Sequence, residues 1–96
     1  MNSEQLNTNQ GTTLVVDDET SVRRVLSATL SGMGFTIVAA SRGQEAVELV
    51  KVAQFDAVLL DVDMPGMGGI ETCRNIRCSN AFLPVRILTA MDSEDV

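Results

Sequence analysis

Acidic side chains follow two short apolar runs of this sequence, at the point where each run ends. The first run ends in Asp17 and Asp18, and the second ends in Asp61, with Asp63 two residues further on. Carboxylates that lie a few ångströms apart raise one another's pKa, so a cluster of them favours a bound cation. Because the chain contains no histidine and these ligands are all oxygen, we expect a hard cation. A site open to water with two or three carboxylates suits Mg²⁺ or Mn²⁺ better than Ca²⁺.

A third apolar run, VRILTA, ends in a hydroxyl and a small side chain, Thr89 and Ala90. Each of these features also has an ordinary explanation. The first acid pair could cap a helix, the second could form a turn, and the threonine could be a β-branched core residue. An acid pair, an acid and a hydroxyl at three separate strand ends together favour one shared site.

Short apolar runs alternate with helical patterns from Thr12 onward, which is typical of an α/β fold with a parallel sheet and crossover helices. Strands are predicted at residues 12–17, 35–40, 56–60 and 85–90. Helices are predicted at residues 19–33, from 41 onward, at 70–77 and, in a first turn only, from Met91. Right-handed crossovers with the second strand at the edge give the order 2-1-3-4. That order brings the acidic strand ends to the carboxyl edge of the sheet, where ligands bind in such folds.

Apolar residues at three- and four-residue spacing define the expected buried face of each helix. In the first helix they are Val22, Val25, Leu26, Thr29, Leu30 and Met33, with Arg23, Arg24 and Ser27 opposite. In the other two they are Ala46, Val47, Val50 and Ala53, and then Ile70, Cys73 and Ile76. Ser41, with Gln44 three residues later, has the form of a capping box that begins the second helix.

Length and composition favour a single domain without membrane or nucleic-acid contacts. We expect a polar tail at residues 1–11 and one folded domain at residues 12–96. The net charge is −6 and the seven basic residues are scattered, which disfavours nucleic acid. The first ten residues are neither basic nor apolar, and no apolar run exceeds four residues, so no membrane segment is predicted. Cys73 and Cys78 have neither redox nor zinc spacing and are expected to be reduced thiols of a cytoplasmic protein.

Three segments, LVVDDE, LLDVDMPGMGG and PVRILTA, together resemble the receiver domains of two-component response regulators. The resemblance extends from Thr12 to Val96 and implies a three-layer, flavodoxin-like (CheY-like) sheet. It also implies that Asp61 is the phosphoacceptor. By the same resemblance Asp18 and Asp61 would ligate Mg²⁺ directly, the backbone carbonyl of Asp63 would be a third ligand, and Asp17 would act through a water. Thr89 would bond a phosphoryl oxygen, and Ala90 would be small enough to leave access open.

The resemblance also implies the partners of such a domain. Since the chain has no histidine, a phosphohistidine must come from another protein, either a sensor histidine kinase or a phosphotransfer protein. An output domain or effector would receive the signal. The domain would be a switch rather than an enzyme, limited to its own phosphorylation and dephosphorylation.

The sequence departs from the family pattern at its end. Receivers have a fifth strand with a lysine that pairs with the phosphoryl group, and the 96 residues end before that position. Lys51, the only lysine, falls in the second predicted helix. We therefore expect residues 1–96 by themselves to be marginally stable or to form a homodimer through the strand at 85–90.

Two other functions stay open at this point. One is a receiver-like interaction or dimerisation module whose site is idle for want of the lysine. The other is a phosphatase of the haloacid-dehalogenase type, since an apolar strand ending in Asp61 and Asp63 also begins that family's motif. Against the phosphatase, Met64 and Pro65 follow Asp63, and the acid pair lies upstream.

Overall fold

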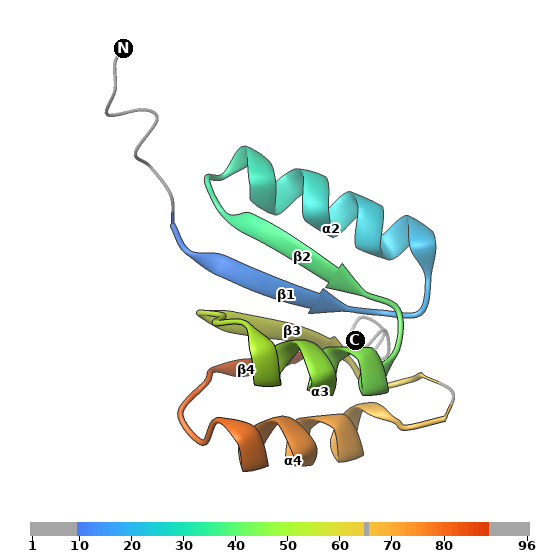
Figure 1. The fold of residues 1–96 in the computed structure, drawn as a ribbon. Coiled ribbons are helices and arrows are strands. Elements are labelled where there is room, and N and C mark those ends of the chain that lie inside the picture. Colours follow the sequence, from blue (N-terminus) through green and yellow to red (C-terminus); the bar gives the residue numbers. More distant parts are fainter. Residues whose placement is uncertain (1–9, 65, 89–96) are drawn as a thin grey trace, which may run out of the picture.

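The computed structural model describes residues 10–64 and 66–88 and has four strands alternating with three helices (Figure 1). The strands are β1 (Thr12–Val16), β2 (Thr36–Ala40), β3 (Ala57–Asp61) and β4 (Val85–Leu88). The helices are α2 (Thr20–Gly32), α3 (Gly43–Val52) and α4 (Gly69–Ser79). Most ends of these elements lie within three residues of the predicted ones. The turn expected from Met91 lies outside the described residues.

All four strands are parallel and lie in the order β2-β1-β3-β4, which confirms the predicted topology. The central strands β1 and β3 carry the core. Leu14 pairs with Val38 on one side and with Val58 on the other, and Leu60 pairs with Ile87. Because side chains of a central strand are covered on both faces, these strands read as nearly continuous apolar runs.

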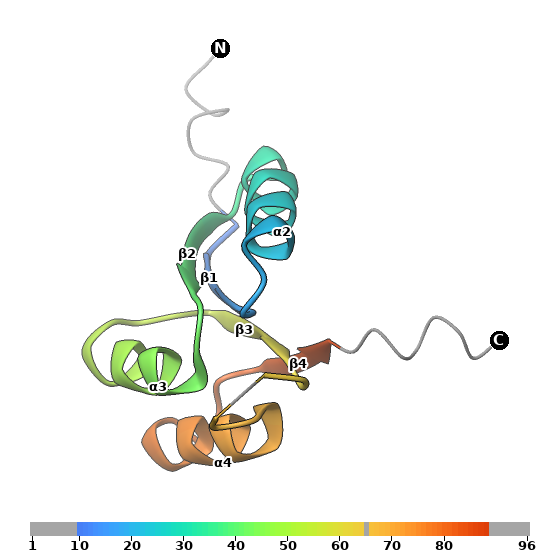
Figure 2. The same cartoon turned by 90° about the vertical axis from the view of Figure 1, so that its right-hand side faces the viewer.

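The sheet lies between two layers of helix (Figure 2). Helix α2 packs against β1 and β2 on one face, while α3 and α4 lie side by side on the other. Ala46, Val47 and Ile76 from that helix pair are buried together with Met64 and Leu83. The CheY-like, three-layer architecture is therefore confirmed. No helix in the two described stretches has the length and hydropathy that a membrane crossing requires.

The predicted buried stripe of α2 is wrong in part. No residue of this helix is fully buried, and Val25 keeps 62% of its surface exposed. Thr29 is exposed as well, as is Met33, just beyond the helix, whereas Val22, Leu26 and Leu30 are half-buried. Among the described residues α2 packs mainly on the two strands β1 and β2, so part of its apolar face stays exposed.

The capping box predicted for α3 is also wrong. The helix begins at Gly43 after Arg42, which makes no side-chain cap bond. A capping box at Ser41 requires Ser41 to be the residue directly before the helix, but the helix begins later. The Ser41 N–H donates to the Glu45 carboxylate at 3.0 Å instead. Of the predicted stripe, Ala53 lies beyond the helix end and is exposed.

Helix α4 is rotated relative to the expected stripe. Ile70 is 59% exposed, whereas Thr72 is completely buried and Ile76 is buried as predicted. The rotation follows from Gly69, whose missing side chain lets the helix start lie directly on β3. A Cβ there would come within 2.6 Å of the Asp61 carbonyl oxygen.

Close packing between α3 and α4 depends on Gly43. A Cβ at this position would overlap the Thr72 hydroxyl and lie 3.1 Å from the Met67 carbonyl oxygen. The Thr72 hydroxyl has no hydrogen-bond partner among the described residues, so it fills space rather than satisfying a polar group. The two helices therefore approach closely because one residue has no side chain.

Gly43→Ala is predicted to destabilise the fold by roughly 1–3 kcal/mol, the usual cost of overpacking. Adding Thr72→Ala should recover most of that loss, because it removes the atom that the new methyl group meets. Gly32→Ala is the matched control: nothing lies within 4 Å of a Cβ there, and we expect a gain of about 0.5–1 kcal/mol. Urea denaturation of the four proteins tests this, and equal stabilities of the two single glycine variants would contradict it.

Candidate functional site

Three carboxylates meet at the carboxyl edge of the sheet. Asp17 and Asp18 follow β1, and Asp61 is the last residue of the neighbouring strand β3. One carboxylate oxygen from each of the three lies within 4.8 Å of the others. The structure therefore brings together three of the acids that the sequence singled out, because neighbouring parallel strands end at the same edge.

Asp17 is held by its backbone and by its side chain. Its N–H donates to the Ala40 carbonyl at 3.1 Å, and its Oδ1 accepts the Glu19 N–H at 2.9 Å. Asp17 is buried, whereas Asp18 is exposed. The helix-capping explanation for this acid pair does not hold, since α2 has no side-chain cap bond. The Asp17 carboxylate instead closes the turn before the helix, and one of its oxygens belongs to the cluster.

Asp61 is half-buried, and its Oδ1 accepts the Asp63 N–H at 3.2 Å. Burial raises the pKa of the Asp61 carboxyl above its ordinary value, and the charges of Asp17, Asp18 and Asp63 act in the same direction. The hydrogen bond from the Asp63 backbone opposes this rise. The Asp63 side chain is exposed and is not one of the three clustered carboxylates. The role expected for its backbone carbonyl as a metal ligand stays a prediction.

An open groove of about 780 Å³ extends from the acids along α2 toward β4. Its apolar wall is formed by Val22, Val25, Leu26, Ile87 and Leu88. The groove gives the carboxylates access to water and leaves space beside Asp61 for a small anionic group. The exposed part of α2 described above is one wall of this groove.

The three acids suit a hard divalent cation. Magnesium binds oxygen at about 2.0–2.1 Å, so ligands on opposite sides of the ion lie about 4.2 Å apart. The three carboxylate oxygens lie within 4.8 Å of one another, which is the range that ligands of one such ion require. An oxygen-only set that is open to water is also the kind that Mg²⁺ prefers. The residues present therefore fit such an ion.

Two predicted site residues, Thr89 and Ala90, lie outside the described residues. The strand β4, which ends at the preceding residue Leu88, is in register with the site, since Leu88 pairs with Asp61. Sequence reasoning also missed a residue. It placed Arg23 on the solvent side of its helix, but the guanidinium bonds to the Asp17 carbonyl oxygen at 2.8 Å. Its position six residues after Asp17, near the start of a helix, was the only available signal.

The raised pKa of Asp61 predicts the effect of removing its charge. The folded state holds the Asp61 proton more tightly than the unfolded state does. Ionisation of Asp61 therefore lowers the free energy of unfolding once the pH exceeds the pKa of Asp61 in the folded state. Below the pKa of Asp61 in the unfolded state, this loss is absent. Without metal, Asp61→Asn should therefore melt at a higher temperature than the wild type at neutral pH. The difference should vanish as the pH falls below the ordinary aspartate range.

Magnesium should reverse the order of the two proteins. At ten times its dissociation constant it should stabilise the wild type by about 1.4 kcal/mol and stabilise Asp61→Asn much less. Asp18→Asn should also weaken the response. Thermal melts with and without Mg²⁺ test both statements. A wild-type melting temperature that does not change with millimolar Mg²⁺ would rule out the metal site.

Comparison with known proteins agrees with this geometry. Response regulator MprA of Mycolicibacterium vanbaalenii is 45% identical over 80 residues, which are 83% of this chain and 35% of that protein. The chain thus spans about a third of the length of the curated relatives it matches.

Solved structures show the same fold. Response regulator protein TrrA of Thermotoga maritima, in a complex with Mg²⁺-BeF, has a TM-score of 0.79 and 33% identity, over 88% of this chain and 76% of that one. TrrA in complex with histidine kinase ThkA has a TM-score of 0.78 and 37% identity, over 82% and 68%. The family model of the response regulator receiver domain matches residues 13–96. This chain therefore belongs to the response regulator receiver domain family.

Proposed function

We propose that this chain is the phosphoacceptor module of a two-component system, in which Asp61 takes a phosphoryl group from a phosphohistidine of a partner protein. The observation that carries the proposal is the convergence of Asp17, Asp18 and Asp61 beside an open groove. The similarity to TrrA, whose structure contains Mg²⁺-BeF, supports it. The module is a signalling switch whose only reactions are its own phosphorylation and dephosphorylation.

Phosphoryl transfer asks mainly for positioning and charge neutralisation. The Asp61 carboxylate attacks phosphorus, and a P–O bond forms as the P–N bond to the donor imidazole breaks. The electron pair remains on that nitrogen, which takes up a proton from water. The Asp63 N–H and the Gly69 backbone, which lies against the Asp61 carbonyl, hold the nucleophile in place.

Mg²⁺ or Mn²⁺, when bound, would neutralise charge on the phosphoryl oxygens. Asp18, Asp61 and the Asp63 carbonyl are the proposed ligands, and Asp17 would act through a water. Thr89 is proposed to bond a phosphoryl oxygen, and Ala90 to keep the approach open. These roles rest on the family resemblance together with the convergence of the acids.

The proposed donor is a sensor histidine kinase or a phosphotransfer protein. The complex of ThkA with TrrA supports a kinase partner for a protein of this fold. An output domain or effector is proposed because MprA is about three times longer than the matched region. We also propose a cytoplasmic location, in keeping with the free thiols of Cys73 and Cys78.

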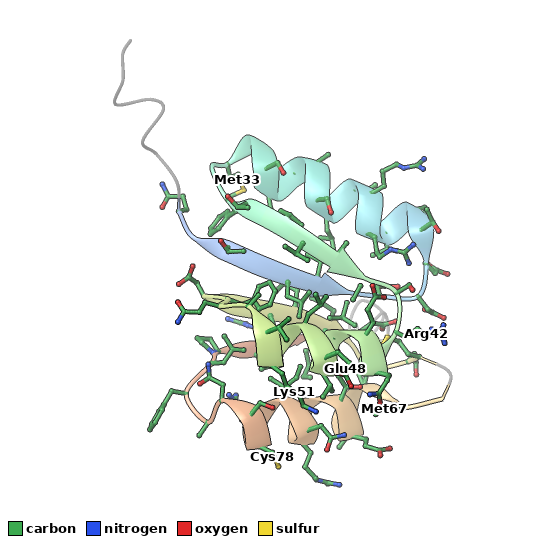
Figure 3. The ribbon with its side chains drawn as sticks, viewed as in Figure 1. Met33, Arg42, Glu48, Lys51, Met67 and Cys78 are labelled. Carbon is green, nitrogen blue, oxygen red and sulfur yellow. The ribbon has the colours of Figure 1, made fainter. Side chains whose placement is uncertain are left out.

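One observation favours the idle interaction module as a second candidate. The described residues that line the groove include no lysine or arginine. Lys51 lies on α3, on the opposite face of the sheet from α2 and its groove (Figure 3). The phosphatase alternative has no comparable support, since the chain belongs to the receiver family.

Incubation with acetyl phosphate and Mg²⁺ is predicted to add one phosphoryl group, as an acid-labile acyl phosphate on Asp61. Asp61→Asn should abolish the addition, because the amide cannot act as the nucleophile. Asp56→Asn is the matched control. This aspartate lies directly before β3, at the opposite end of the strands from the acid cluster, so labelling should persist.

Intact-mass measurement and peptide mapping of the same samples distinguish the candidates. An unlabelled wild type that still binds Mg²⁺ would indicate the idle module. Phosphate mapped to a serine or threonine would contradict the role of Asp61. Steady turnover of an aryl phosphate would instead favour the phosphatase.

We further propose that residues 1–96 form a homodimer through β4. This strand pairs with β3, and no other described strand lies on its second edge, beside the apolar wall of the groove. The Pro84 carbonyl accepts the N–H of Val58 in β3, and the Leu88 carbonyl accepts the N–H of Val62 just after β3. Since bonded residues alternate in a parallel ladder, the N–H groups of Val85 and Ile87 point to the open edge.

Light scattering over a range of concentrations is predicted to show association of residues 1–96. Val85→Pro should weaken it, because proline removes an outward N–H and leaves the ladder to β3 intact. Arg86→Lys keeps the charge and every backbone donor and serves as the control. A wild type that stays monomeric and fully stable at high concentration would contradict the open-edge argument.

A further inference from the structure

The guanidinium of Arg23 reaches back from the first turn of α2 to the end of β1. Its Nη1 donates to the Asp17 carbonyl oxygen at 2.8 Å, and its Nη2 donates to Thr20 Oγ1 at 3.2 Å. The side chain is half-buried, whereas its neighbour Arg24 on the same helix is exposed. Arg23 therefore links the start of the helix to the segment that carries the acid pair.

This contact completes a set of three hydrogen bonds that hold Asp17, the residue directly before Asp18. The Asp17 N–H is held by Ala40, and the Asp17 carboxylate is held by the Glu19 N–H. Arg23 holds the remaining polar group, the Asp17 carbonyl. Asp18 itself is exposed, so the direction of its carboxylate depends on how firmly these flanking groups are held.

Helix stabilisation does not account for this placement. A cation near a helix N-terminus opposes the helix dipole, and α2 has neither an acidic residue in its first turn nor a side-chain cap bond. The two bonds of Arg23 also run to a carbonyl and a hydroxyl rather than to a carboxylate. Arg23 therefore occupies no carboxylate oxygen of the cluster through these two bonds.

We infer that Arg23 is a positioning residue of the metal site, which fixes the Asp17–Asp18 peptide so that both carboxylates converge with Asp61. The inference rests on the proposed metal site. The fork of the guanidinium matters more than its charge, because two donors at fixed spacing bind the carbonyl and the hydroxyl together. Loss of such an outer contact typically weakens metal binding by about 10–100-fold.

The test compares Mg²⁺ affinity by calorimetry at a temperature far below unfolding, so that only folded protein is titrated. Arg23→Ala should weaken binding roughly 10-fold or more, and Arg23→Lys should restore only part of it. Thr20→Val, which removes one arm of the fork, should have a smaller effect in the same direction. Arg24→Ala, which removes a charge of the same helix without this contact, should bind like the wild type.

A second readout uses the metal-free proteins. Amide exchange at Glu19, whose N–H is held by Asp17, should be faster in Arg23→Ala than in Arg24→Ala. If Arg23→Ala binds Mg²⁺ as tightly as the wild type and its amide exchange at Glu19 is unchanged, the role of Arg23 is overturned and the metal site is not. Full rescue by lysine would show that charge, not positioning, is what Arg23 supplies. A wild type that takes up no Mg²⁺ would overturn the metal site and this inference together.

Discussion

Three carboxylates held within 4.8 Å of one another are the constraint on which the rest of this structure depends. Asp17, Asp18 and Asp61 repel each other, and burial adds to the cost at Asp61, whose pKa is raised. Only a rigid frame keeps them together. The frame is the pair of central strands β1 and β3, whose side chains Leu14, Val16, Val58 and Leu60 are completely buried. The buried core thus holds together three carboxylates that repel one another when no cation is bound.

The two faces of the sheet contribute differently to that frame. On the face of α3 and α4, glycines at the helix starts allow close packing, and Gly69 presses the start of α4 against the backbone of Asp61. On the other face, α2 leaves Val25 exposed and borders an open groove that ends at the acids. Asp61 is therefore supported firmly from one side and open to the groove on the other. This asymmetry is in keeping with the role proposed above for Asp61.

Arg23 shows how a small contact can link fold and site. Its bonds join the first turn of α2 to the Asp17 carbonyl, so the helix and the acid pair are one mechanical unit. The segment after Asp61 is held in a comparable way, by the Asp63 N–H and by Gly69. At both acidic strand ends a backbone N–H two residues further on donates to Oδ1 of the aspartate, which fixes the direction of its carboxylate.

The sequence by itself determined the parallel sheet, its order and the convergence of the acids, because central strands must be apolar throughout and neighbouring parallel strands end at one edge. It also contained the motifs of the receiver family. Tertiary structure alone decided which part of the α2 stripe is covered, how α4 is rotated, and that Gly43 and Thr72 meet. It also decided that Arg23 faces the acids rather than solvent. Periodicity records which residues share a helix face, but not how much of that face a neighbour covers. A long side chain can also reach a backbone group that no spacing rule identifies.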